Sequence, residues 1–203
     1  MDMISENNAL RLTGTLAGRP HFSHSSRGAE FWQFPLAVRR LSGTEDILNI
    51  VARRELLEAL APEEAEKLQV LGELRSFNNR SGTGAKLVIT AYAHALSRSD
   101  GEDENSLCLT GTLCKPPTLR QTPLGRDICD LMLAVNRHYG RSDYLPCICW
   151  GSLAREAACW AVGQRLRLEG RVQSRRYLKN TDLGAEERIA YEVSVAAAEP
   201  IES

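Results

Sequence analysis

Aromatic rings and arginines lie close together in the C-terminal half of the chain. Tyr144 and Trp150 bracket one β-rich run, and Tyr177 directly follows Arg175 and Arg176. Ring faces stack on planar groups, and guanidinium groups bind phosphates through paired hydrogen bonds. Together these side chains could hold a ligand that combines flat rings with phosphates.

The other reactive residue types show no spacing typical of a catalytic or metal site. Cys147 and Cys149 flank Ile148, but no cysteines form the CxxC pair of a zinc site. The histidines include no HExxH motif, and residues 82–86 lack the spacing of a phosphate-binding loop. We expect the cysteines to be reduced and to serve as small core residues. The sequence predicts no enzyme, no metal and no cofactor.

An internal repeat organises the chain around these residues. LRLTGTL at 10–16 recurs as LCLTGTL at 107–113, and LAV at 36–38 recurs at 133–135. At the same spacing Asp46 meets Asp143, and one insertion later Ser76 meets Ser174. We therefore predict two homologous domains, residues 1–98 and 106–203. The acidic residues 99–105 are predicted to be a solvated linker between them.

Each repeat shows the same order of elements. β-rich runs begin near residues 10 and 107 and are followed by runs at 31–39 and 128–136, then at 47–53 and 144–150. Helices are predicted at 55–67 and at 152–161, where Ser152 could cap. Two further strands close each repeat, at 68–77 and 86–96 and again at 165–177 and 188–197. The fold class is all-β with one helix per unit, as two tandem five-stranded OB-fold barrels.

The second repeat resembles the bacterial single-stranded DNA-binding protein family. The motifs that carry the resemblance are LTGTL, PLG, LAVNR, CICWGSLAREA and GQRLRLEGRVQSRRY, in this order from residue 109 to 177. The resemblance implies that the base-stacking aromatics are Tyr139, Tyr144, Trp150 and Tyr177. The nearest candidates for phosphate contact are Arg137, Arg175, Arg176 and Lys179.

The first repeat departs from this pattern. Ser42, Ile47 and Arg53 stand where the second repeat has Tyr139, Tyr144 and Trp150. The weaker candidates left in this repeat are Arg53, Arg54, Phe77 and Trp32. Phe31 and Trp32 are adjacent, so strand alternation should bury one ring and expose the other. We expect the first barrel to bind DNA more weakly or to serve mainly in assembly.

The functional prediction is sequence-independent binding of single-stranded DNA in replication, recombination or repair. The resemblance to a duplicated form of the family implies a homodimer with four OB-folds. A cytoplasmic location is expected, because no apolar run is long enough to cross a membrane. The alternative is a protein-interaction scaffold in a replication or mobile-element assembly, which the net charge of −1 allows. An RNA- or tRNA-binding protein is a lesser alternative.

Partner recruitment is a second point of departure from the family. Its members usually end in a flexible tail whose acidic tip recruits replication and repair enzymes, whereas this sequence ends in AAAEPIES. Replication proteins are the class of protein partner that the resemblance implies.

Overall fold

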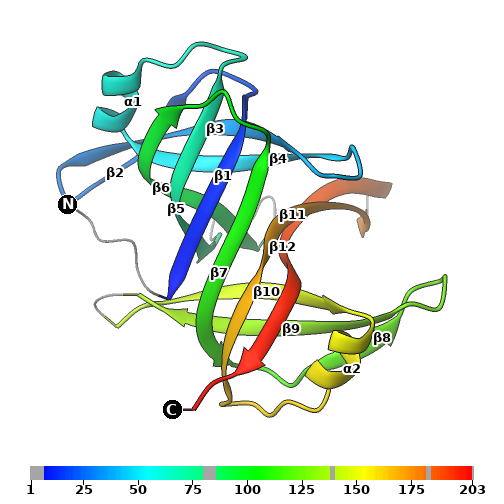
Figure 1. Ribbon diagram of the computed structural model, residues 1–203. Coiled ribbons are helices and arrows are strands. Elements are labelled where there is room, and N and C mark those ends of the chain that lie inside the picture. Colours follow the sequence, from blue (N-terminus) through cyan, green and yellow to red (C-terminus); the bar gives the residue numbers. More distant parts are fainter. Residues whose placement is uncertain (1–6, 80–85, 138–139, 182–183, 203) are drawn as a thin grey trace. The chain divides into compact units, whose positions relative to one another are not determined.

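The computed structural model describes residues 7–79, 86–137, 140–181 and 184–202. Strands hold 67% of the residues and helices 7%, so the chain is an all-β protein. It divides into two compact units, which Figure 1 traces along the chain. Unit 1 consists of residues 1–75 and 89–107, and unit 2 of residues 76–88 and 108–203. Unit 2 thus includes described residues of the first repeat, at 76–79 and 86–88. The domain boundaries drawn from the sequence stay a prediction.

Unit 1 is built from the first repeat. Its elements are β1 (Asn8–Leu16), β2 (His21–Ser26), β3 (Ala29–Arg39), β4 (Glu45–Arg53), α1 (Arg54–Leu60), β5 (Lys67–Asn78) and β6 (Leu87–Arg98). The strands follow the order β2-β3-β4-β6-β5-β1, and β1 also pairs with β3. That second pairing closes the sheet into a barrel.

Unit 2 repeats this arrangement. Its elements are β7 (Glu104–Leu113), β8 (Thr118–Gln121), β9 (Asp127–Asn136), β10 (Ser142–Trp150), α2 (Ser152–Ala157), β11 (Arg165–Thr181) and β12 (Gly184–Pro200). The strand order is β7-β11-β12-β10-β9-β8, with the closing pair β7–β9. Strands β10 and β12 run parallel, as β4 and β6 do in unit 1.

Alternating side chains fill the interior of each barrel. In unit 2 the buried series along β10 is Leu145, Cys147 and Cys149, and Val193 of β12 is the register partner of Cys147. Burial raises the pKa of the Cys147 and Cys149 thiols, which keeps them protonated. These cysteines and Cys129 are core residues as predicted, whereas Cys159 is exposed.

Glycines at equivalent positions of the two barrels allow the strands to approach closely, and Gly72 and Gly170 are one such pair. A Cβ atom on Gly170 would overlap the Ser194 carbonyl, and one on Gly72 would overlap the Tyr92 carbonyl. Any larger residue would push the strands apart. The shared glycine of the two repeats is therefore a packing requirement.

The helices are shorter than the sequence predicted. Helix α1 ends before Pro62, because Ala61 adopts a left-handed conformation with φ 43°. Helix α2 ends at Ala157, and its N-cap is Gly151 with φ 60° rather than Ser152. Strands β2 and β8 were not predicted, and each lies at one end of its unit's strand order.

The acidic segment 99–105 is not a fully solvated linker. Asp103 lies 2.8 Å from Lys67 Nζ and accepts a 2.7 Å hydrogen bond from the Arg39 amide. Burial raises the pKa of Asp103, but the contacts with Lys67 and Arg39 outweigh it and lower that pKa. The prediction of a solvated linker is thus wrong for Asp103, because this carboxylate packs against unit 1.

Within the described part of the chain, no helix is long and apolar enough to span a membrane.

Candidate functional site

Two predicted stacking residues lie on the outside of the unit 2 barrel. Leu145, Cys147 and Cys149 point inward along β10, so the alternating positions Tyr144 and Trp150 point outward. Tyr144 is 49% exposed, and Trp150 is half-buried opposite Ile128 of β9. Tyr144 therefore offers an open ring face, and Trp150 a partly open one.

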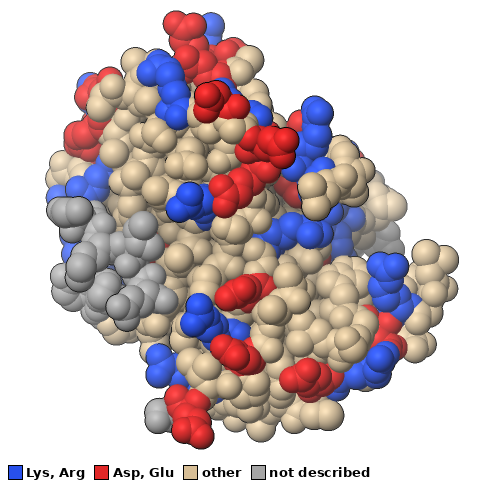
Figure 2. Space-filling view, in the orientation of Figure 1, with Lys and Arg blue, Asp and Glu red and all other residues tan. Residues whose placement is uncertain are grey.

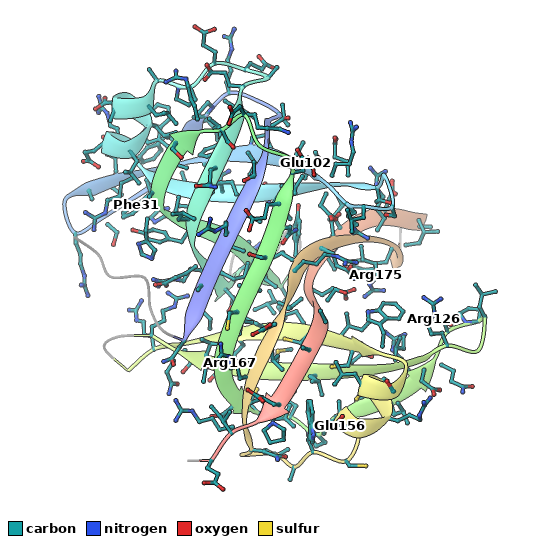
Figure 3. The ribbon with its side chains drawn as sticks, in the orientation of Figure 1. Phe31, Glu102, Arg126, Glu156, Arg167 and Arg175 are labelled. Carbon is teal, nitrogen blue, oxygen red and sulfur yellow. The ribbon has the colours of Figure 1, made fainter. Side chains whose placement is uncertain are left out.

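Tyr177 and Arg175 lie on the same outward side, on β11. Val172 of β11 is the register partner of the inward-facing Val193, so residues 173, 175 and 177 point outward. The Arg175 guanidinium, labelled in Figure 3, lies 5.8 Å from the centroid of the Tyr177 ring. This distance is that of a cation–π contact. A ring and a cation thus stand together on the strand surface.

Carboxylates also stand on this side of the barrel. Glu192 of β12 accepts a 2.9 Å hydrogen bond from Gln173 and lies 3.6 Å from Arg175 Nε. Asp130 of β9 is hydrogen-bonded by Arg120 of β8 at 2.5 and 3.0 Å, which raises the pKa of Arg120. Both arginines therefore face acidic partners in the free protein. Basic and acidic side chains also intermingle over the visible face in Figure 2.

We call this surface the outer face of unit 2. Its residues come from strands β8 to β12 and comprise Arg120, Asp130, Tyr144, Trp150, Gln173, Arg175, Tyr177 and Glu192. Of these, Gln173 and Glu192 point outward but are buried.

Arg176 does not share this face with Arg175. Its register partner on β12 is Ile189, so its side chain leaves the ribbon on the side opposite Tyr177. The guanidinium lies 3.6 Å from Glu187 and is 75% exposed. Arg176 therefore stays a predicted phosphate contact, but one on the opposite side of the ribbon from Arg175, because neighbouring residues of a strand point in opposite directions.

Arg137 is engaged in a structural network within unit 2. Its guanidinium forms paired hydrogen bonds with Asp143 and donates a 3.0 Å bond to the Ser76 carbonyl. Asp143 is 1% exposed and also accepts a 2.5 Å bond from the Ser76 amide. The Ser76 hydroxyl accepts a 2.7 Å bond from the Tyr144 amide. Arg137 was predicted to contact phosphate, but its Nε and Nη2 atoms are engaged with a buried carboxylate and a backbone carbonyl, and these contacts position β10.

Two predicted site residues cannot be placed. Tyr139 lies outside the described residues, and of Lys179 only the backbone in β11 is described.

The weaker candidates are dispersed. Arg53 is exposed at the end of β4, and Phe77 is 54% exposed in the hairpin segment that belongs to unit 2. Arg54 donates to Glu58 at 2.6 Å and to Glu30 at 3.1 Å.

Trp32 is the register partner of the fully buried Ala52, and its indole Nε1 is buried with no hydrogen-bond partner among the described residues. Trp32 is thus half-buried on the inward-facing side of β3, a position that does not support its prediction as an outer platform.

Unit 1 instead holds a ring cluster that the sequence did not reveal. Phe31 is the register partner of the exposed Arg53, which places it on the outer side of the barrel. His24 stacks on Phe31 with ring centroids 4.8 Å apart, and the Tyr92 ring lies 6.0 Å from Phe31 at a tilt of 43°. Arg75 lies 5.2 Å from the centroid of Tyr92. Strand alternation alone could not tell which of Phe31 and Trp32 faces outward. The register with β4 does, because Phe31 is paired with Arg53 and Trp32 with Ala52.

A carboxylate sits beside this cluster. Glu73 accepts a 3.0 Å hydrogen bond from His94 Nε2 in the tautomer that protonates that nitrogen, and it lies 2.5 Å from Arg75. Burial raises the pKa of Glu73, but the contacts with His94 and Arg75 outweigh it and lower that pKa. The cluster therefore holds an ionised carboxylate.

Sequence comparisons point to one family. Residues 104–201 match the model of the "Single-strand binding protein family". The chain is 35% identical over 80 residues to Single-stranded DNA-binding protein 2 of Listeria innocua, covering 36% of this chain and 50% of that protein. It is 32% identical over 80 residues to Single-stranded DNA-binding protein 3 of Streptococcus agalactiae, covering 36% and 58%. The chain spans about half the length of the curated relatives it matches.

Solved structures extend the likeness in fold. The wild-type single-stranded DNA binding protein from Thermus aquaticus superimposes with a TM-score of 0.79 at 23% identity, covering 97% of this chain and 93% of that one. A deletion mutant of the same protein gives a TM-score of 0.78 at 24% identity, covering 97% and 95%. At this identity the likeness concerns the fold alone. It confirms the OB-fold class predicted from the repeats.

Proposed function

Because residues 104–201 match the model of the single-strand binding protein family, we propose that the chain binds single-stranded DNA on the outer face of unit 2. The observation that carries the proposal is the placement of Tyr144, Trp150 and Tyr177 on one side of the barrel. Every base has a flat face, so stacking on these rings requires no particular sequence. Binding is therefore sequence-independent.

Stacking supplies enough free energy for a useful affinity. Each stacked base contributes about 1–3 kcal/mol, so the three rings give about 3–9 kcal/mol before ordering costs. Arg175 lies beside Tyr177 and would meet the phosphate of a base stacked there. Glu192 is 3.6 Å from Arg175 Nε, beyond hydrogen-bond distance, so a phosphate can compete for that guanidinium.

A protein that binds DNA without catalysing a reaction would change the DNA by mass action. Since the protein would bind the unpaired form of DNA alone, it would shift hairpins toward the open strand. Replication, recombination and repair all expose such strands, and we propose that the protein serves there, in the cytoplasm, as a non-enzymatic binder. Replication proteins remain the class of partner to test.

Assembly is a further part of the proposal. We propose that two chains pair, so that the dimer presents four barrels. A light-scattering mass of twice the 22.5 kDa chain supports the pairing, and a mass of one chain contradicts it.

One observation favours a second candidate, a protein-interaction scaffold with little DNA binding. Arg120 and Arg175 both face carboxylates, which weakens the positive field that a nucleic acid would meet.

Fluorescence anisotropy separates the two candidates. The full chain is titrated into labelled oligo-dT and into a duplex of equal length, at several salt concentrations. We expect preference for the single strand and an affinity that falls as salt rises. Equal binding of both forms, or none at low salt, favours the scaffold.

A further inference from the structure

His24 and Phe31 of unit 1 are stacked as a base stacks on an aromatic side chain. Their ring centroids are 4.8 Å apart and the ring planes differ by 12°. Near-parallel rings at this separation are in stacking contact. An imidazole is a flat, nitrogen-containing ring, and in this geometry it occupies the space that a nucleobase on Phe31 would fill.

Phe31 stands at a position that corresponds to the outer face of unit 2. In unit 2 the register pair Ile128 and Trp150 joins β9 and β10. The equivalent pair in unit 1 is Phe31 and Arg53, which joins β3 and β4. In unit 2 the aromatic residue of the pair, Trp150, is on β10, whereas in unit 1 the aromatic residue, Phe31, is on β3. Arg53 stands at the position equivalent to Trp150. Both units therefore have one aromatic side chain at this pair, and in unit 1 its partner is a cation, Arg53.

The low exposure of Phe31 comes partly from rings that lie on it. The side chain is on the outside of the barrel, yet Phe31 is only 8% exposed. His24 covers one side of the ring, and Tyr92 lies 6.0 Å away at a tilt of 43°. Tyr92 belongs to the central strand β6, whereas His24 belongs to β2 at the end of the strand order. Of the two rings next to Phe31, only that of His24 lies on a strand at the end of the strand order.

His24 is held by few contacts. Every residue of β2 is exposed or half-buried, and the register of β2 with β3 shifts between Phe22 and His24. A shift of this kind redirects the side chain that follows it. Besides the stack, the His24 ring has a 3.1 Å hydrogen bond with the exposed Ser23 hydroxyl. Moving the ring therefore costs one stacking contact and one exposed hydrogen bond.

We propose that Phe31 is a base-binding platform of unit 1 and that His24 occupies it in the free protein. The ligand is an unpaired nucleobase of a single strand, which displaces the imidazole and stacks in its place. Arg53, the register partner of Phe31, lies where it would meet the adjoining phosphate. This inference rests on the proposed binding of single-stranded DNA and assigns unit 1 a share in it.

The test removes the imidazole and measures binding to oligo-dT. The full chain is used, in a background that carries Tyr144→Ala and Tyr177→Ala so that unit 2 no longer dominates the affinity. His24→Ala should raise the affinity about two- to tenfold, the range expected from the loss of one competing ring contact. His24→Phe keeps a stacked ring and should lower the affinity or leave it unchanged. His21→Ala is the matched control, because His21 also lies on β2 but is hydrogen-bonded to Gln33 at 2.8 Å instead.

A second variant tests the platform itself. Phe31→Leu, added to His24→Ala, should abolish the gain, because an aliphatic side chain cannot stack. Should that variant not fold, as judged by its thermal transition, a gain in affinity in His24→Ala that His24→Phe lacks decides the matter.

The failures of the two proposals are distinguishable. If the wild-type chain does not bind oligo-dT, the proposed function is wrong. If the wild-type chain binds but His24→Ala leaves the background affinity unchanged or lowers it, only the platform of unit 1 is refuted. A gain that survives Phe31→Leu refutes it equally.

Discussion

Arg175 stands between a ring and a carboxylate on the outer face of unit 2. Its guanidinium carbon lies 5.8 Å from the Tyr177 centroid, and its Nε lies 3.6 Å from Glu192. The cation is therefore partly neutralised at the place where a phosphate would arrive. This relationship makes Glu192 a competitor of the ligand.

Neutralising this competitor should strengthen DNA binding. Glu192→Gln keeps the shape of the side chain and an oxygen that accepts from Gln173, but it removes the charge that attracts Arg175. A partly exposed ion pair contributes about 0.2–1 kcal/mol, so we expect a gain in oligo-dT affinity of up to about fivefold in an anisotropy titration.

The matched control is Glu187→Gln. It neutralises the acid beside Arg176, on the other side of the ribbon, and should change the affinity little. A loss of affinity in Glu192→Gln, or an equal gain in Glu187→Gln, would contradict the role given to Glu192.

The two units should contribute unequally to affinity. Replacing Trp150 and Tyr177 by alanine removes two rings of the outer face of unit 2. At about 1–3 kcal/mol per stacked base, the dissociation constant for oligo-dT should rise at least about 30-fold. The comparison variant is Arg53→Ala with Phe77→Ala, for which we expect a much smaller loss. Equal losses in the two double variants would remove the assignment of the main site to unit 2.

The buried pair of Arg137 and Asp143 should govern stability rather than binding. Asp143→Asn leaves the guanidinium without its carboxylate and weakens the bond from the Ser76 amide. The free energy of unfolding should fall by about 2–4 kcal/mol in urea denaturation, below the full cost of a wholly buried pair because Arg137 is 24% exposed.

Glu58→Gln is the control for this prediction. It weakens the exposed contact with Arg54 and should leave the free energy of unfolding nearly unchanged, because an exposed ion pair adds little stability. If Asp143→Asn keeps its stability but loses DNA affinity at a temperature where it is folded, Arg137 is a binding residue after all.

Unit 1 should lose stability in acid through Glu73. Its contacts with His94 and Arg75 lower the pKa of the carboxyl in the folded state, so the unfolded chain binds the proton more readily. The stability contributed by Glu73 is therefore full above its ordinary pKa of 4.5 and is lost as the pH falls through the lowered folded value. Urea midpoints measured from about pH 6 to about pH 3 should fall less steeply in Glu73→Gln than in wild type.

Glu64→Gln is the control for this acid dependence, because Glu64 is an exposed residue whose nearest cation is 4.0 Å away. Identical slopes in wild type and Glu73→Gln would show that the contacts of Glu73 do not act in this way.

The structural features that follow from a periodic pattern of residues could be predicted from the sequence. The repeat and the order of strands gave the OB-fold class, and the alternation along β10 permitted Tyr144 to face outward. The same alternation separates Arg175 from Arg176, a signal that was present and not applied. Pro62 likewise marked the end of α1, because proline and the residue before it disfavour a continuing helix.

Pairings between distant segments could not be predicted. Asp143 lies far along the chain from Ser76, so no local pattern links them. The nearer pair of Arg137 and Asp143, by contrast, recurs in the first repeat as Arg40 and Asp46, a signal that was present and not applied. Phe31 and Trp32 are both aromatic, so only their partners Arg53 and Ala52 decide which ring faces outward. The stack of His24 on Phe31 depends further on β2, a strand that the sequence did not indicate.

The quenching of tryptophan fluorescence by oligo-dT tests the central claim most directly. Trp150 lies on the outer face of unit 2, whereas Trp160 is buried and Trp32 faces inward. A base stacked on Trp150 should quench the fluorescence of the wild-type chain at low salt, and Trp150→Phe should lose most of that quenching while still binding. Binding without any quenching, or quenching that Trp150→Phe leaves intact, would contradict stacking on this face.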